Sequence, residues 1–150
     1  MNKKKIIFLI VCAFMVFSSA FCQAETQIPS KPLKGMDGLK KAIAIQIKTK
    51  QPIILWSSWR FCLNCGKVKK WFSGQEVTEN LKNYPRVILS SKGGRDEQKE
   101  SERMGFTGGH FYIIYDYNAK SYNSVWAWEY GTHKMKRDLL SQLKSKAEQH

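Results

Sequence analysis

Residues 53–65 read Ile-Ile-Leu-Trp-Ser-Ser-Trp-Arg-Phe-Cys-Leu-Asn-Cys, and this stretch decides both the fold and the chemistry. The apolar run at its start, which follows Pro52, predicts a short buried strand. Cys62 and Cys65 stand in a Cys-x-x-Cys spacing where that strand should pass into a helix. A cysteine in the first turn of a helix is stabilised as a thiolate by unpaired N–H groups and by the helix dipole. The stretch therefore predicts a redox or metal site, and a merely structural disulfide is the alternative.

The N-terminal segment has the three parts of a secretory signal peptide. A basic head, Lys3–Lys5, precedes the uncharged stretch Ile6–Phe17, and small residues then lead up to Ala24. The apolar stretch is shorter than the about 20 residues that a membrane span needs. We therefore expect residues 1–24 to be a cleaved signal peptide and the mature chain to be periplasmic or otherwise exported. A membrane anchor, formed by an uncleaved N-terminus or one lipidated at Cys22, is the alternative.

The charge of the chain is strongly positive, with a formal net charge of +13 over 150 residues. Removing residues 1–24 takes away three lysines and lowers this charge to +10. The remaining length suits one domain with a real core, and its lysines occur in nearly every segment. This spread predicts a solvated basic surface and no nucleic-acid partner. We expect a monomer.

The remaining pattern predicts an extended lead-in over residues 25–35 and a single domain over residues 36–150. Helices are expected over residues 37–48, 62–72, 76–82, 96–104 and 133–147, and strands over residues 52–57, 84–90, 111–117 and 122–128. The first two strands are separated by a helix and should be parallel, while the last two should form a hairpin. This order predicts an α/β fold: a small mixed sheet flanked by helices on both faces.

Periodicity also predicts which side chains face the core. We expect Asp37 to cap the first helix. The predicted inward-facing sets are Leu39, Ile43 and Ile47 in the first helix, Val77 and Leu81 after the Ser73-Gly74 break, Leu139, Leu140 and Leu143 in the last helix, and Trp126 with Trp128 packed beneath that helix.

This element order, with Cys-x-x-Cys opening the helix after the first strand, resembles the thioredoxin-like fold from about residue 37 to residue 146. The segment Phe61–Cys65, followed by Trp71-Phe72-Ser73 and Val77, is similar to one branch in particular. That branch is the C-terminal thioredoxin-like domain of the thiol:disulfide interchange protein DsbD and its single-domain relatives. Gly131 also falls where thioredoxins place a glycine after their last strand.

The resemblance implies an exported thiol–disulfide oxidoreductase that needs no cofactor and exchanges disulfides with partner proteins. Reductase or electron-relay work is favoured, with a membrane protein as a candidate electron donor. Cys62 would be the nucleophile and Cys65 the resolving thiol. Trp59 and Phe61 would form an apolar lip that docks partner polypeptides, together with Gly109 in the facing loop; a packing role for the two aromatic residues is an equal alternative.

Two positions depart from the thioredoxin pattern. His110 stands where thioredoxins have a cis-proline, and because a cis bond before a non-proline residue costs about 2.5–4 kcal/mol, we expect a trans Gly109–His110 peptide. Trp56 stands six residues before Cys62, where many thioredoxins bury an acid. The core should therefore lack the usual proton acceptor for the second cysteine.

His110 has three candidate roles. It could give acid–base help as a third catalytic residue, since imidazole titrates near neutral pH. It could join Cys62 and Cys65 as a ligand of Cu(I) or Zn²⁺. It could also simply fill the space of the proline. Two alternative functions follow from these departures: a metal-binding module that uses these three residues, and a non-catalytic thioredoxin-fold adaptor.

Overall fold

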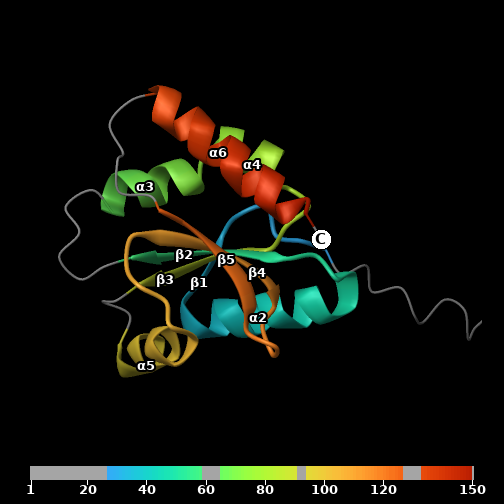
Figure 1. Cartoon of the computed structure of the whole chain (residues 1–150), viewed down its shortest axis with the longest axis vertical. Helices are drawn as coiled ribbons and strands as arrows, with labels where there is room; N and C mark the ends of the chain where they lie inside the picture. Colours follow the sequence, from blue (N-terminus) through green and yellow to red (C-terminus); the bar gives the residue numbers. More distant parts are fainter. Residues whose placement is uncertain (1–26, 59–64, 91–93, 127–132, 150) are drawn as a thin grey trace, which may run out of the picture.

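The computed structural model describes residues 27–58, 65–90, 94–126 and 133–149. They form a five-stranded sheet in the order β1-β3-β2-β4-β5, with helices on both faces (Figure 1). The elements are β1 (Leu33–Lys34), α2 (Gly35–Thr49), β2 (Ile53–Ser58), α3 (Cys65–Phe72), α4 (Gln75–Asn80), β3 (Arg86–Ser90), α5 (Arg95–Met104), β4 (His110–Asp116), β5 (Ser121–Trp126) and α6 (His133–Ala147).

The central strand of the sheet is β2, and every one of its residues is buried. It runs parallel to β3, where Leu55 pairs with Val87, and antiparallel to β4, where Leu55 pairs with Tyr112. β1 pairs in parallel with β3, and β4 and β5 form the antiparallel hairpin. The mixed α/β sheet predicted from the sequence is confirmed.

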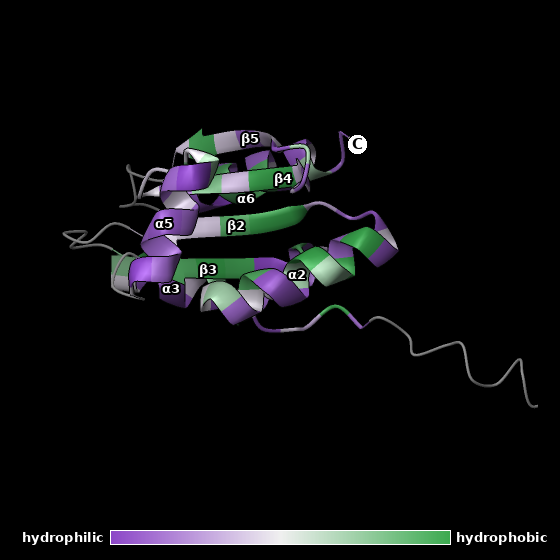
Figure 2. Ribbon diagram, turned by 90° about the horizontal axis from the view of Figure 1, so that it is seen from below, coloured by the Kyte–Doolittle hydropathy of each residue, from purple (hydrophilic) through white to green (hydrophobic). Residues whose placement is uncertain are grey.

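Alternation along β2 divides the core into two layers, because successive side chains of a strand point to opposite faces. Ile54 and Trp56 belong to a cluster formed with α3, α4 and α6, which we call the redox-helix core. Ile53 and Leu55 belong to a second cluster with Leu39 of α2, on the other face of the sheet. Figure 2 shows β3 and much of β2 in the hydrophobic colour, with the mostly hydrophilic helix α5 in front of the sheet.

The helices of the redox-helix core follow the predicted pattern closely. α6 runs over His133–Ala147 as expected, and its leucines at 139, 140 and 143 are buried. α3 ends at Phe72 and α4 begins at Gln75, so the break predicted at Ser73-Gly74 is confirmed. Val77 and Leu81 are fully buried, as predicted.

The first helix corrects two predictions. α2 begins at Gly35, its N-cap residue Lys34 makes no side-chain capping bond, and Asp37 instead lies exposed in the first turn, 3.7 Å from Lys40. Ile47 is 55% exposed and does not face the core. Each step of four residues turns the helix by about 40° beyond a full rotation, so two steps from Leu39 carry Ile47 off the buried stripe.

The lead-in contributes an edge strand that the sequence did not reveal. Leu33 and Lys34 pair with Val87 and Ile88 of β3. A Cβ atom added at Gly38 would lie 2.9 Å from the carbonyl carbon of Leu33, so the glycine permits close packing of α2 on β1.

The opposite edge of the sheet is β5. There the Nζ atom of Lys146, from α6, donates to the carbonyl oxygen of Ser124 at 3.1 Å. The last helix therefore contacts the backbone of the edge strand β5.

No helix within the four described stretches is long and apolar enough to cross a membrane. The predicted signal peptide, residues 1–24, lies outside the described residues.

Candidate redox site

The candidate site lies at the end of the sheet where β2 finishes. Cys65 is the first described residue of α3, separated from the end of β2 by residues 59–64. Its side chain is half-buried, packs against the redox-helix core and is disulfide-bonded. Cys62, Trp59 and Phe61 lie outside the described residues, so their predicted roles as nucleophile and docking lip stay predictions.

The loop before β4 closes on this end of the sheet. The N–H group of Gly109 donates to the carbonyl oxygen of Ser57 at 2.8 Å. No cis peptide bond occurs within the described residues, so the predicted trans Gly109–His110 bond is confirmed. Gly109 has a φ of +86°, which glycine adopts readily and other residues rarely do. The glycine therefore holds the loop beside the last residues of β2.

Gly109→Ala is expected to lower the free energy of unfolding by about 1–2 kcal/mol, because the alanine must adopt a positive φ. Urea denaturation measures the change. Gly66→Ala is the matched control: Gly66 lies in α3, and an added Cβ there meets nothing within 4 Å. The control should gain roughly 0.5–1 kcal/mol from helix propensity. Equal effects of the two substitutions would contradict the strain argument.

His110 begins β4 and pairs with Trp126 of β5. The two rings lie 4.1 Å apart between centroids at an interplanar angle of 64°, and the ring of Tyr112 lies 5.9 Å from that of His110. Phe111, between His110 and Tyr112, points into the redox-helix core. By alternation His110 and Tyr112 leave the strand on the opposite face from the layer against which Cys65 packs.

The environment of His110 favours the neutral imidazole. Burial lowers the pKa of His110, and its Nδ1 atom is buried without a hydrogen-bond partner among the described residues. A neutral ring with an open nitrogen is the form that can accept a proton or bind a metal. Within the described part of the chain, no group of three His, Cys, Asp or Glu side chains could hold a metal ion. The predicted set of Cys62, Cys65 and His110 includes a residue outside that part and stays a prediction.

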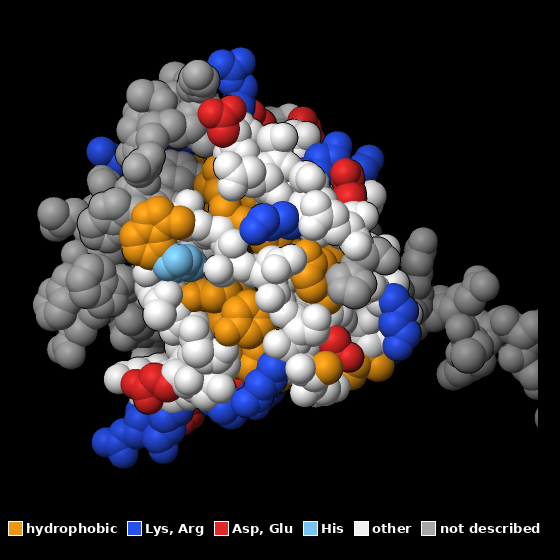
Figure 3. All heavy atoms as spheres, viewed as in Figure 1, with side chains coloured by type: hydrophobic (Ala, Val, Ile, Leu, Met, Phe, Trp, Pro, Cys, Tyr) orange, Lys and Arg blue, Asp and Glu red, His pale blue; other side chains and the backbone are white. Residues whose placement is uncertain are grey.

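Trp126 corrects an expectation about packing. Its side chain is 52% exposed and lies against His110, whereas its neighbour Val125 is buried in the redox-helix core. The residue facing the last helix is therefore Val125, and Trp126 points to the other side of the sheet. Figure 3 shows that hydrophobic side chains are exposed in places on this face of the molecule, among charged and other polar ones. Trp128 lies outside the described residues.

The position where many thioredoxins bury an acid is occupied by a tryptophan in the described core. Trp56 is 1% exposed, and among the described residues its Nε1 atom has no hydrogen-bond partner. The buried polar or charged side chains of the described residues are Gln46, Ser57, Ser58 and Arg86, and none is a carboxylate. Arg86 is the buried charge that sequence reasoning missed; its signal was an arginine at the start of an apolar strand.

Comparisons with known proteins identify the fold. No family model matches the sequence, and no curated protein sequence matches it. A thioredoxin from Thermus thermophilus, solved in solution, is similar with a TM-score of 0.55 and 15% identity, over 78% of this chain and 87% of the thioredoxin. The crystal structure of the oxidised C-terminal domain of Neisseria meningitidis DsbD is similar with a TM-score of 0.51 and 11% identity, over 77% of this chain and 98% of that domain. The chain therefore has a thioredoxin-like fold, and the predicted likeness to the DsbD domain is confirmed at the level of the fold.

Proposed function

We propose that this chain is an exported thiol–disulfide oxidoreductase that exchanges disulfides with partner proteins through Cys62 and Cys65. One observation carries the proposal: Cys65 opens the described part of the helix that follows the central strand of a thioredoxin-like sheet. The loop at Gly109, bonded to the end of that strand, supports it by closing on the same end of the sheet.

The proposed exchange has two steps. The Cys62 thiolate attacks one sulfur of a disulfide in the partner, so that a mixed disulfide forms and the other partner sulfur leaves as a thiolate. The Cys65 thiol loses its proton, and its thiolate then attacks the Cys62 sulfur and releases the second partner thiolate. The two partner thiolates take up two protons, equal to those that Cys62 and Cys65 lost. The partner gains two electrons and two protons, and the Cys-x-x-Cys pair becomes a disulfide. A donor dithiol must then reduce the pair again; a membrane protein is the donor that we propose.

The charge of α3 supports the role of Cys62 as a thiolate. Lys67, Lys69 and Lys70 are exposed on the helix, and the first turn of its described part, which begins at Cys65, holds no acidic residue. Positive charge near a thiol lowers its pKa, although solvent screens lysines at the surface. The acid–base role predicted for His110 is not part of this proposal, because its side chain leaves β4 on the opposite face of the sheet from the layer against which Cys65 packs.

A redox titration of residues 25–150 tests the proposal. Thiols are trapped with an alkylating reagent at each potential and counted by mass. We expect a reversible transition of two thiols between about −120 and −300 mV, with the low end favouring a reductase. A pair locked in one state would instead support the adaptor. Labelling that requires a chelator would support the Cu(I) or Zn²⁺ module.

A further inference from the structure

Arg86 is a buried cation in the first position of β3. Its side chain is 1% exposed, and it is the one charged residue among the buried polar side chains of the described chain. Nη1 donates to the carbonyl oxygen of Phe72 at 2.9 Å. Nη2 donates to the hydroxyl of Thr78 at 3.1 Å and to the carbonyl oxygen of Ser30. The guanidinium carbon also lies 5.8 Å from the centroid of the Phe72 ring.

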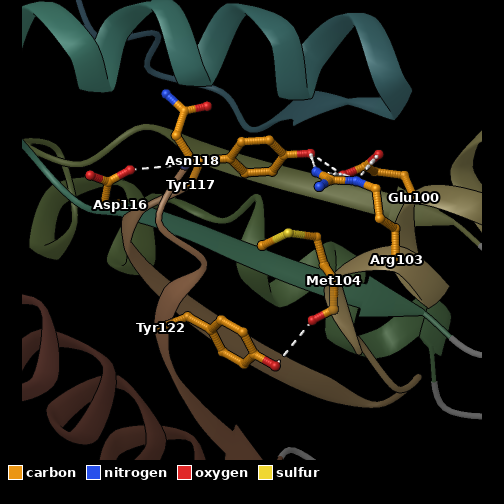
Figure 4. A network of polar contacts seen from close by, with 7 residues as sticks. All are labelled: Glu100, Arg103, Met104, Asp116, Tyr117, Asn118 and Tyr122. Atoms are coloured by element: carbon orange, nitrogen blue, oxygen red, sulfur yellow. Dashed lines mark hydrogen bonds and ion pairs between the residues drawn. The ribbon is translucent and has the colours of Figure 1, made fainter.

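No carboxylate balances this charge within the described residues, where every hydrogen-bond acceptor of Arg86 is neutral. Arg103 is a contrast: its Nη2 atom lies 2.7 Å from Oε1 of Glu100 and also donates to the Tyr117 hydroxyl (Figure 4). Burial lowers the pKa of Arg86 to about 10, which leaves the group protonated at neutral pH. The core therefore holds an uncompensated positive charge.

The charge of Arg86 lies at the C-terminal end of α3, the helix that carries Cys65. Phe72, whose carbonyl accepts from Arg86, is the last residue of α3, and Cys65 is its first described residue. At a rise of 1.5 Å per residue the two lie roughly 10 Å apart along the helix. A cation at a helix C-terminus interacts favourably with the helix dipole. Because Arg86 is buried, salt screens its field much less than that of a surface lysine.

The other ionisable groups on elements around α3 differ in exposure. The exposed groups are Lys67, Lys69 and Lys70 on α3, Glu76 and Glu79 on α4, Arg137, Asp138 and Lys144 on α6, Glu148 just beyond α6, and Lys31 in the lead-in. Three groups are partly buried: Lys136 and Lys146 of α6, and Tyr115 of β4. Tyr84, before β3, is buried. Tyr84 has a raised pKa, owing to burial and to Glu148, and stays neutral near pH 7. Among the described residues around α3, Arg86 is therefore the charged side chain that is fully buried.

We propose that Arg86 is a positioning residue that tunes the redox pair: its buried charge, bound to the C-terminal end of α3, stabilises the thiolate at the N-terminal end. The inference rests on the proposed function. The position where many thioredoxins bury an acid is Trp56 here, and the buried charge of this core is instead a cation at the far end of α3. Stabilising the thiolate favours the reduced form of the pair and raises its reduction potential.

Arg86→Met tests the proposal in the mature chain, because it removes the charge and keeps an apolar side chain of similar length. The pH dependence of the alkylation rate gives the pKa of the more reactive thiol. We expect that pKa to rise by roughly half to one unit, as one charge does at this range and an effective dielectric constant of about 20–40. Arg86→Lys, which keeps the charge, should shift the pKa by less than half as much.

Arg103→Met is the matched control, since it removes an arginine that Glu100 already balances. Circular dichroism and thermal unfolding establish that each variant folds. Equal pKa shifts for Arg86→Met and Arg103→Met, or for Arg86→Met and Arg86→Lys, would overturn the proposal.

A salt titration of the unaltered chain can overturn the proposal even if Arg86→Met does not fold. The thiol pKa should stay depressed between about 0.05 and 0.5 M salt, because a buried cation is poorly screened. A depression that vanishes at high salt would assign the effect to the surface lysines and overturn the proposal. Absence of any reversible two-thiol couple in the unaltered chain would instead refute the proposed function itself.

Discussion

Cys62→Ser is expected to abolish exchange with protein disulfides, lowering the rate by roughly three orders of magnitude or more. A serine hydroxyl does not ionise near neutral pH, so the variant has no thiolate to attack a disulfide sulfur. The measurement is the rate at which the reduced protein opens the disulfide of a model substrate, followed by alkylation and mass. The fold should be unaffected, because the change replaces one sulfur atom by oxygen.

Cys65→Ser is the partner variant for this experiment. It keeps the attacking thiol and removes the resolving thiol, so the mixed disulfide between Cys62 and the substrate should accumulate. The structure supports this order, since Cys65 packs against the redox-helix core and is only half-exposed. Unchanged exchange in Cys62→Ser, or an adduct that forms through Cys65, would contradict the assignment.

Phe111→Ala is expected to lower the free energy of unfolding by about 3–5 kcal/mol, the usual cost of truncating a fully buried aromatic residue. Phe111 is 0% exposed, and its ring lies 5.1 Å from that of Phe72, 6.0 Å from that of Trp71 and 6.3 Å from that of Trp56. These contacts join β2 and β4 to α3. The truncation should therefore leave a cavity beneath α3.

Urea denaturation of Phe111→Ala, Phe111→Leu and Trp126→Ala measures this effect. The leucine variant should lose less than the alanine variant because it fills most of the cavity. Trp126→Ala is the surface control, and at 52% exposure it should lose less than about 1 kcal/mol. Similar losses for Phe111→Ala and Trp126→Ala would mean that Phe111 does not anchor the core.

The elements with a strong local pattern could be predicted from the sequence. The leucines of α6 repeat at helical spacing, and the last helix has the predicted bounds. The apolar run of β2 predicted a buried strand, and together with the element order and the two cysteines it indicated the fold. Such patterns can be recognised because burial of one helix face, or of a whole strand, requires apolar residues at regular positions in the sequence.

The features that depend on distant partners could not be predicted. β1 has two residues, too few to show any alternation, and exists because β3 pairs with it. Trp126 faces His110 because of the hairpin register, which includes an irregularity between Ile114 and Asp116. A one-residue change of register reverses the face of every side chain that follows. Arg86 donates to carbonyl groups of residues 14 and 56 positions away in the sequence, and no local sequence pattern indicates these contacts.

The two borders of the sheet have a consequence for self-association. Exposed edge strands invite pairing with other chains, and proteins limit this with short edges and with lysines. Here one border is the two-residue β1, and on the other Lys146 already occupies a carbonyl group of β5. The two-residue β1 thus offers an added strand little backbone on one border, and on the other border one carbonyl group of β5 is already bonded within the chain.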